Sequence, residues 1–558
     1  MSASRRILIL GEDTQSFLTV IRSLGRAGFE VHVAWCPLDS AALNSRFVHY
    51  IHNIPAFQPG ENAPWISAFQ CLLQNWDFAL VLPTTDSSIL PLQLNRSLFE
   101  PFARLYLLPD DVFSICADKS QSSALAHSLG ISTPRGVLVS NIQEALAATH
   151  SLGYPLVLKP TTSANSRNPT ARQKVQKARS EAELTTLVAE MTSSSPVLAQ
   201  QNFIGLGIGV EVLCTKGRIL LHFQHERVHE PLQGGGSSYR RSVVLSPDLL
   251  DATRKLMESL SYTGVAMVEF KLNRSTGEWI FVEINARFWG SLPLTAAAGL
   301  DFPLALVLLL LDGFEPSSST YRIGMYCRHW GRDLQWFLGN LRADKSNPEL
   351  QTQSHSATAM EALNILAGRE RSDTFTLRDP APAFHDLHQF FAEKFFRVLK
   401  LVRPFRNRHH KRLRRLYTSA ESVIVCCHGN ICRSPFAGIL VARTGRQMLS
   451  RGVHPIAGRA SPVNAIAAAH EFGTDLESHR SSLLTLDEIR SADLILIFDR
   501  RNWLSLRALA PQYMHRVAFL GAGDPEGSLE IPDPYGEDLD AFRSCYVRIT
   551  KALQQLSA

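Results

Sequence analysis

The chain has 558 residues, 45% of them hydrophobic and 19% charged, which is an ordinary globular composition but more than one domain needs. Its net charge of +6 comes from one segment, because residues 403–415 hold seven Lys or Arg and no acid, which leaves 50 bases against 51 acids elsewhere. A uniformly basic surface is therefore excluded. The basic run lacks the regular aromatic interleaving of a nucleic-acid site, and we favour a solvated linker over a contact with anionic membrane.

Cysteine use and apolar runs bear on the compartment. Nine cysteines are spread without a pairing rhythm, which favours the reducing cytoplasm. We expect no signal peptide, because the apolar run before Gly11 has only four residues. We also expect no transmembrane segment, since the longest apolar run, residues 302–311, is too short to cross a bilayer and predicts a buried helix.

Residues 1–112 are predicted to form an α/β domain with a parallel sheet. Apolar strands at residues 5–10, 31–35 and 78–86 alternate with helical patterns, the first of which runs to Leu24. No G-x-G-x-x-G follows the first strand, so nicotinamide binding is not expected.

The next segment, residues 113–315, resembles an ATP-grasp domain. A D-K pair at 118–119, G-I-S-T-P at 130–134 and G-Y-P-L-V-L-K-P at 153–160 are similar to the entry of that fold. The resemblance implies that Lys119 and Lys159 contact ATP phosphates. V-L-A-Q-Q-N-F-I-G at 197–205 resembles the family's hinge beside the adenine, with Gln200 and Gln201 at its polar positions; an ordinary edge strand is the alternative.

Two further strands, at residues 264–270 and 279–285, look like the family strands that carry magnesium ligands. Glu269 and Glu283 place one carboxylate on each strand, and the amide oxygen of Asn285 follows on the same face as Glu283. These hard oxygens suit Mg²⁺ bridging ATP phosphates, with Mn²⁺ as an alternative ion. A hydrogen-bonded ladder without metal stays open. Arg287 continues the face, and the resemblance places it near an acyl phosphate.

One departure from the ATP-grasp pattern concerns the phosphate lid. Residues 161–180 contain no glycine, so we expect either a glycine-rich lid at residues 234–238 or a lid that is not glycine-rich. Polar residues flank that run and are candidates for a carboxylate pocket, with solvated loops as the alternative: His225, Glu226, Arg227, Arg240 and Arg241. Residues 316–402 are predicted to be a helical appendage, and residues 403–420 the basic linker.

The most informative stretch is V-I-V-C-C-H-G-N-I-C-R-S-P at residues 423–435, an apolar strand followed by a tight loop and a helix start. Cys427 and Arg433 stand six apart, so the loop N–H groups and the guanidinium can converge on one tetrahedral anion. Pro435 suits the first helical position. A thiol facing amides, an arginine and a helix N-terminus is expected to be a thiolate nucleophile near neutral pH.

This stretch resembles the active-site loop of the low-molecular-weight protein tyrosine phosphatases, C-x-G-N-x-C-R-S-P on a flavodoxin-like fold. A second family mark, I-P-D-P-Y at 531–535, implies that Asp533 is the general acid. The resemblance further implies that Ser434 hydrogen-bonds the thiolate, that Asn430 holds a strained loop, and that Cys432 can pair reversibly with Cys427; an inert core thiol is the alternative for Cys432. An arsenate reductase on the same fold is disfavoured, because it needs a further cysteine pair and only one cysteine follows.

Together these features predict a multidomain α/β protein: an ATP-grasp fold with an N-terminal α/β pre-domain, and a flavodoxin-like phosphatase domain with a central parallel sheet at residues 421–558. We expect an ATP-dependent carboxylate–amine ligase working through an acyl phosphate, joined to a phosphocysteine phosphatase. Expected partners are small-molecule carboxylates and amines, and a phosphotyrosine protein or phosphorylated metabolite; no nucleic acid is expected and oligomerisation stays open. The alternative is a phosphatase regulated by a non-catalytic ATP-binding module.

Overall fold

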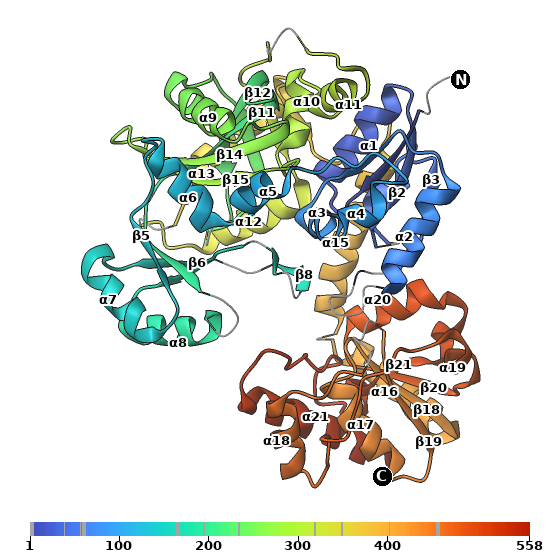
Figure 1. Cartoon of the computed structure of the whole chain (residues 1–558). Helices are drawn as coiled ribbons and strands as arrows, with labels where there is room; N and C mark the ends of the chain where they lie inside the picture. The colour runs from blue at the N-terminus through green and yellow to red at the C-terminus, as the bar shows by residue number, and fades with distance from the viewer. Residues whose placement is uncertain are drawn as a thin grey trace. The chain divides into compact units, whose positions relative to one another are not determined.

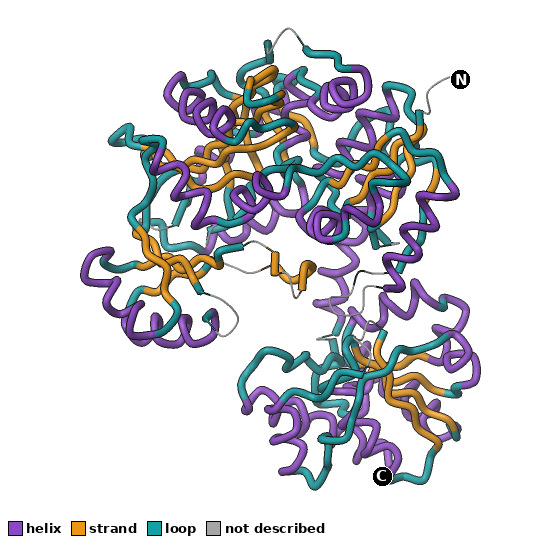
Figure 2. The backbone as a smooth tube through the Cα atoms, viewed as in Figure 1, coloured by secondary structure: helices purple, strands orange, loops and turns teal. Residues whose placement is uncertain are grey.

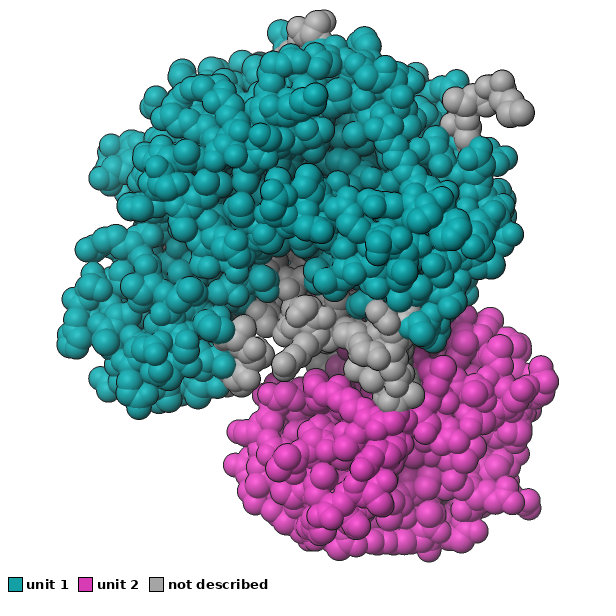
Figure 3. Space-filling view, in the orientation of Figure 1, with its two compact units in different colours: residues 1–388 teal, residues 389–558 magenta. Residues whose placement is uncertain are grey.

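The computed structural model describes residues 5–37, 39–55, 57, 63–162, 164–165, 168–172, 175–192, 196–232, 235–316, 320–347, 350–400, 402–453 and 458–557. The chain forms two compact units, Met1–His388 and Gln389–Ala558 (Figure 3). Both combine sheets with packed helices, as Figure 2 shows, which confirms the predicted multidomain α/β class. Gly234 and parts of residues 161–180, where a phosphate lid was considered, lie outside the described residues.

Unit 1 begins with a four-stranded parallel sheet in the order β3-β2-β1-β4. Its strands are β1 (Arg6–Leu10), β2 (Glu30–Ala34), β3 (Tyr50–Ile51) and β4 (Leu80–Pro83). Its helices are α1 (Ser16–Arg26), α2 (Ala63–Asn75), α3 (Asp86–Leu94) and α4 (Arg96–Phe99) (Figure 1). Ile7 and Ile9 enter one apolar core while Leu8 and Leu10 enter another, since successive strand residues point to opposite faces.

A second sheet of unit 1, in the order β5-β10-β6-β9, carries the predicted hinge. Its antiparallel strands are β5 (Gly136–Val139), β6 (Leu156–Pro160), β9 (Gln176–Ala178) and β10 (Val197–Gln201). The accompanying elements are helices α7 (Ile142–Leu152) and α8 (Glu181–Met191) and the hairpin of β7 (Ala164–Asn165) and β8 (Asn168–Arg172). This sheet holds Lys159 on β6, with Gln200 and Gln201 at the end of β10.

The third sheet of unit 1 has seven strands in the order β15-β14-β11-β12-β13-β16-β17. They are β11 (Leu206–Thr215), β12 (Arg218–His229), β13 (Tyr239–Ser242), β14 (Gly264–Leu272), β15 (Trp279–Asn285), β16 (Tyr326–Arg328) and β17 (Glu370–Ser372). The remaining helices that begin in unit 1 are α5 (Asp110–Ala117), α6 (Lys119–Ser128), α9 (Pro247–Ser259), α10 (Leu292–Ala298), α11 (Phe302–Asp312), α12 (Trp330–Arg342), α13 (His355–Met360), α14 (Ala362–Leu366) and α15 (Ala381–Leu399).

Two features of these elements concern the expectations for residues 302–402. The segment after residue 315 is not purely helical, because β16 and β17 extend the seven-stranded sheet. Within the described residues no single helix has the length and apolar composition of a membrane span; α10 and α11, which meet at 91°, reach these limits only when taken as a bent pair.

Unit 2 contains four parallel strands in the order β19-β18-β20-β21. They are β18 (Ser422–Cys427), β19 (Gln447–Gly452), β20 (Leu494–Ile497) and β21 (Val517–Phe519). The helices are α16 (Arg403–Ser419), α17 (Arg433–Ala442), α18 (Val463–Glu471), α19 (Leu486–Ser491), α20 (Arg500–Leu509) and α21 (Leu539–Ser557). The order 2-1-3-4, counted from β18, is that of a flavodoxin-like sheet, in which ligands bind at the carboxyl ends of the strands.

The basic run is helix α16 and not an open linker. Leu413 and Tyr417 lie one turn apart on the helix and are buried in the core of unit 2. The side chains of Arg406 and Arg412 donate to backbone carbonyls of the same unit. Charge alone favours a solvated segment, but the apolar stripe of the helix packs it against the core of unit 2.

Candidate active sites

The first candidate site lies where β18 ends and α17 begins, at the carboxyl edge of the parallel sheet in unit 2. Cys427 is the last residue of β18 and is 3% exposed. Its Sγ accepts a hydrogen bond from the N–H of Asn430 at 3.2 Å and lies 3.1 Å from Ser434 Oγ. The loop therefore already directs donors at the sulfur, as a thiolate nucleophile requires.

Asn430 fixes the shape of this loop. Its φ of 53° lies in the left-handed region, which asparagine tolerates better than most residues. Its side chain is fully buried, donates to Ser434 Oγ at 2.9 Å and to Ser450 Oγ at 2.7 Å, and accepts from the N–H of Ser482 at 2.9 Å. His479 donates from Nε2 to the Asn430 carbonyl at 2.7 Å. These bonds hold the strained turn in place.

Arg433 joins the loop to two distant carboxylates. Its guanidinium is buried and donates to Asp499 and to Asp533, each at 2.6 Å, and to the carbonyl of Ile531 at 3.0 Å. Burial opposes the charge of Arg433, yet the carboxylates, Asp533 foremost, hold its pKa above the usual value. The structure thus brings Asp533, whose side chain is 39% exposed, beside the arginine of the loop.

The other cysteines of unit 2 have apolar surroundings. Cys426 is fully buried in the core, as expected for a strand residue, and burial raises its pKa. Burial likewise raises the pKa of Cys432, and that of Cys545 to about 12. All nine cysteines are free thiols, so a Cys427–Cys432 pair stays a prediction.

The second candidate site lies in unit 1, where lysines from two elements approach Glu283. Lys119 opens helix α6, and its Nζ lies 3.3 Å from Glu283 Oε2 on β15. Burial disfavours the charged form of Glu283, but Lys119, Lys159 and Arg287 counteract it and hold the pKa of this carboxyl below its usual value. Three cations from different elements therefore act on one carboxylate.

The pKa of Lys159 leads to a testable pH dependence. Burial lowers this pKa to about 8, against the opposing effect of Glu283. If Lys159 contacts ATP, it does so as the protonated ammonium. Below pH 8 Lys159 already carries that proton, whereas above pH 8 it must take up a proton when ATP binds. We expect the dissociation constant for ATP to rise about tenfold per pH unit above pH 8. Calorimetric titration with ATP from pH 7 to 9.5 measures this dependence. In Lys159→Arg the dissociation constant should no longer change with pH. A dissociation constant of the wild type that is already independent of pH would contradict the prediction.

Glu269 and Glu283 face each other across the β14–β15 pair. Arg227 Nη2 lies 2.6 Å from Glu269 Oε2, and Asn285 Nδ2 donates to Glu283 Oε1 at 3.2 Å. The two carboxylates and the Asn285 amide oxygen form a set of hard oxygen donors. The carboxylates already pair with cationic side chains, Arg227 and Lys119, and the set fits a magnesium site. Three predicted ligands thus lie together.

Arg287 belongs to the same cluster. Its Nε donates to Asp86 Oδ1 at 2.7 Å and its Nη2 to Asn285 Oδ1 at 3.0 Å. Burial opposes its charge, but Asp86 holds the pKa of Arg287 above the usual value. Asp86 begins α3 directly after β4, so the N-terminal sheet positions this arginine.

The two hinge glutamines differ in orientation. Gln200 is 4% exposed, and its Oε1 has no partner among the described residues. Gln201 is exposed, and its Oε1 accepts from Arg135 Nε at 3.2 Å. Successive residues of a strand point to opposite faces, so only one of these side chains can face a given side of the hinge.

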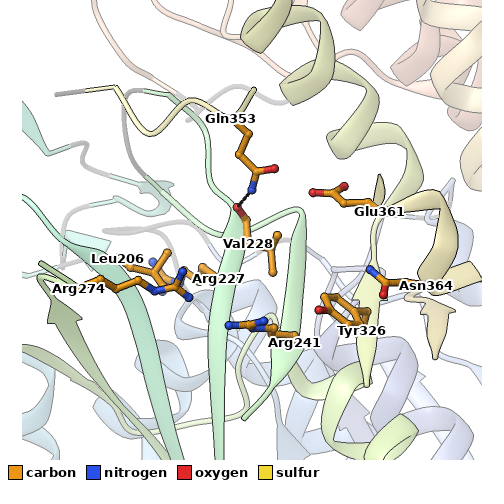
Figure 4. Close-up of a pocket in the computed structure, with 9 residues that line it drawn as sticks. All are labelled: Leu206, Arg227, Val228, Arg241, Arg274, Tyr326, Gln353, Glu361 and Asn364. Carbon is orange, nitrogen blue, oxygen red and sulfur yellow. Dashed lines mark hydrogen bonds between the residues drawn. The ribbon is translucent and has the colours of Figure 1, made fainter. Parts of the chain in front are cut away.

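The five residues expected to form a carboxylate pocket separate into two groups. His225 is buried against Glu211, and Arg240 is fully buried against Asp373, so neither is available to a ligand. Arg227 and Arg241 instead line a cavity of about 250 Å³, shown in Figure 4. The Glu226 side chain accepts from Arg241 at 2.8 Å. The expected pocket is therefore wrong for His225 and Arg240.

Sequence reasoning missed several residues of the two sites. Asp499, Asp86 and Lys271 were not assigned a role, although the first two directly follow buried strands, where functional side chains of parallel sheets gather. Lys271 acts on Lys159 electrostatically. The partner of Glu269, Arg227, was considered only for a substrate pocket.

Comparison with known proteins matches both units. A family model described as low molecular weight phosphotyrosine protein phosphatase matches residues 422–558, and one described as ATP-grasp in the biosynthetic pathway with Ter operon matches residues 193–328.

The match to individual phosphatases covers about nine tenths of the length of those proteins. The low molecular weight protein-tyrosine-phosphatase Etp of Escherichia coli K12 is 33% identical over 137 residues, which are 24% of this chain and 91% of that protein. Wzb of the same organism is 32% identical over 137 residues, which are 24% of this chain and 92% of that protein.

Among solved structures, the ADP complex of N5-carboxyaminoimidazole synthetase from Staphylococcus aureus is 16% identical, with a TM-score of 0.47, and the match covers 60% of this chain and 85% of that one.

Proposed function

Since the chain belongs, through residues 422–558, to the low molecular weight protein-tyrosine-phosphatases and joins an ATP-grasp domain to them, we propose that each unit has its own active site. Unit 2 hydrolyses a phosphomonoester through Cys427. Unit 1 uses ATP to join a carboxylate to an amine. The observation that best supports the first activity is the convergence of Asn430 and Ser434 on Cys427 Sγ, with Arg433 alongside. For the second it is the placement of Lys119 Nζ 3.3 Å from Glu283 Oε2, with Glu269 opposite Glu283 on the neighbouring strand.

In unit 2, the sulfur of Cys427 attacks phosphorus, the bond to the leaving oxygen breaks, and a phosphocysteine forms. Asp533 gives its proton to the leaving oxygen. It then takes a proton from the water that attacks the phosphocysteine, which releases phosphate and the thiolate. Arg433 and the loop N–H groups stabilise the charge on the transferred group, while Asn430 keeps the loop in shape. The substrate class is a phosphotyrosine protein or a phosphorylated metabolite.

Replacing Asp533 with asparagine is expected to slow the phosphatase about 100- to 10,000-fold, because the leaving oxygen then departs without a proton. The loss should be larger for phenyl phosphate than for para-nitrophenyl phosphate, whose leaving group is a weaker base. Steady-state rates on both substrates check this, with exposed Asp540→Asn as the matched control. Equal losses on the two substrates would contradict the role of Asp533 as general acid.

In unit 1, Lys119 and Lys159 hold the ATP phosphates, and the hinge at Gln200 and Gln201 adjoins the adenine. The residues that would hold Mg²⁺, or Mn²⁺ as an alternative, are Glu269, Glu283 and Asn285. When bound, the ion neutralises phosphate charge. A substrate carboxylate oxygen attacks the γ-phosphorus and ADP leaves, giving an acyl phosphate beside Arg287. The amine then attacks the carbonyl carbon, phosphate leaves and takes up the proton that the nitrogen loses, and the amide remains.

The ligase proposal is tested by ADP formation from the full chain with pools of small carboxylates and amines. ADP release that needs both pools supports it. Tight ATP binding without turnover against any pool would instead favour a module that regulates the phosphatase. We further propose a cytoplasmic location, because Cys427 acts as a reduced thiol and all nine cysteines are free.

A further inference from the structure

The cavity of unit 1 lies between the seven-stranded sheet and the segment that follows α12. Its floor comes from β11, β12, β13 and β16, and Gln353, Glu361 and Asn364 close the other side (Figure 4). Gln353 Nε2 donates to the Val228 carbonyl at 3.2 Å, which ties this segment to β12. The volume of about 250 Å³ equals that of about eight water molecules at about 30 Å³ each. It suits a molecule of single-amino-acid size.

Two of the three arginines that line one side of the cavity, Arg241 and Arg274, carry excess positive charge, whereas the third, Arg227, is already paired with Glu230 and Glu269. Arg241 and Arg274 both donate to the same oxygen, Oε2 of Glu226, at 2.8 and 2.6 Å. Among the described residues, Arg241 and Arg274 form ion pairs with Glu226 alone, so two cations share one carboxylate. The group has a net charge of +1 and donors to spare for a second carboxylate.

The opposite side carries excess negative charge. Glu361 accepts from His229 Nε2 at 2.8 Å and from Arg328 Nη2 at 3.1 Å. His229 also bonds Asp333 through Nδ1 at 2.8 Å, and Glu370 accepts from Arg328 at 2.8 Å. Burial disfavours the His229 cation, but its two carboxylate partners hold its pKa above the usual value. Three described carboxylates thus face two cations, which leaves a net charge of −1.

Arg227 connects the cavity to the proposed metal site. It lines the cavity, and its Nη2 bonds Glu269 while its Nη1 bonds Glu230 at 2.9 Å. The close approach of Arg227 to β11 requires glycine at position 207, where an added Cβ would meet Arg227 Cδ and Glu230 Oε1 at 2.7 Å. The arginine-lined side of the cavity is therefore the side that adjoins the ATP chemistry.

From this distribution of charge we propose that the cavity binds a zwitterionic α-amino acid. Its carboxylate lies against Arg241 and Arg274, and its ammonium lies toward Glu361. The proposal rests on the ligase function above and names its acyl substrate: the carboxylate on the Arg227 side is the one that is phosphorylated. Leu206 and Val228 supply apolar surface for the side chain.

The test measures binding to the full chain without ATP, so it does not depend on turnover. Each of the twenty proteinogenic L-amino acids is titrated by calorimetry, beside its methyl ester, which lacks the carboxylate, and its N-acetyl derivative, which lacks the ammonium. At least one amino acid is expected to bind, with both derivatives about 10- to 100-fold weaker. Binding of no amino acid, or of derivatives as tightly as parents, would overturn the proposal.

Two variants locate the binding. Arg274→Ala, on an exposed turn, and Glu361→Gln should each weaken binding about 10- to 100-fold, whereas Arg254→Ala and Glu278→Gln, on other exposed surfaces, should not change it. Glu361 lies in a buried network, so if its variant fails to fold, Arg274→Ala decides alone. Unchanged affinity in Arg274→Ala would overturn the site.

The outcome is separable from the fate of the ligase proposal. Arg274-dependent amino acid binding without ADP formation against any amine would retain the site and remove the ligase activity. ADP formation with carboxylates that lack an ammonium, unchanged by Arg274→Ala and Glu361→Gln, would retain the ligase activity and remove the amino acid site.

Discussion

Replacing Cys427 with serine is expected to lower turnover of para-nitrophenyl phosphate about 10⁴-fold or more, to the limit of detection. The reason is that a serine hydroxyl is a far weaker nucleophile than the cysteine sulfur. The substitution alters the two contacts of the sulfur, with the Asn430 N–H and with Ser434 Oγ, and leaves the hydrogen bonds of the Asn430 side chain in place. Binding of phosphate or vanadate should therefore persist.

The matched control is Cys71→Ser, an exposed thiol in unit 1. It should have wild-type phosphatase activity. Turnover by Cys427→Ser at more than a few per cent of the wild-type rate would remove Cys427 from the mechanism, and the family assignment would then describe only the fold.

Replacing Glu283 with glutamine should lower ATP-dependent ADP formation about 100- to 1,000-fold. Glutamine keeps the shape of the side chain but removes the charge on which Lys119, Lys159 and Arg287 converge. Both the proposed magnesium site and the positions of the phosphate-binding lysines depend on that charge. Rates are measured with saturating ATP over a range of Mg²⁺ concentrations.

Exposed Glu278, one residue before β15, provides the matched control as Glu278→Gln and should be neutral. Recovery of the Glu283→Gln rate at high Mg²⁺ would point to a weakened metal site. ADP formation at the wild-type rate under all conditions would instead exclude Glu283 from the catalytic centre.

The phosphatase loop is predictable from the sequence because its contacts are local. Cys427, Asn430 and Ser434 lie within eight residues, and a strand followed by a helix start leaves few ways to arrange them. The partners of Arg433 are a different case, because Asp499 lies 66 and Asp533 100 residues later. A family motif identifies Asp533, whereas Asp499 has no such motif.

The same distinction holds in unit 1. Glu269 and Glu283 pair across two strands joined by a short turn, so their neighbourhood follows from the strand pattern. The bond between Arg287 and Asp86 spans 201 residues and two sheets, and no local pattern indicates it. The polar residues near residues 234–238 show the limit of composition, since Arg240 and Arg241 are adjacent yet point to opposite faces of β13.

In the basic helix α16, high charge and apolar periodicity predict different surroundings for the same residues. Its seven bases within 403–415 suggest a solvated segment, but Leu413 and Tyr417 recur at helical spacing and are buried. Long arginine side chains let a helix carry high charge while its apolar stripe packs. Periodicity was the better guide than charge.

The proposed function requires two separate anion-binding sites in one chain, one in each unit. The most direct measurement assays both activities, ADP formation and para-nitrophenyl phosphate hydrolysis, on the same preparations of wild type, Cys427→Ser and Glu283→Gln. We predict a crossed pattern, in which each variant loses one activity and keeps the other within about twofold of wild type. A variant that loses both activities while folded, or either variant that keeps the activity assigned to its site, would contradict the proposed function.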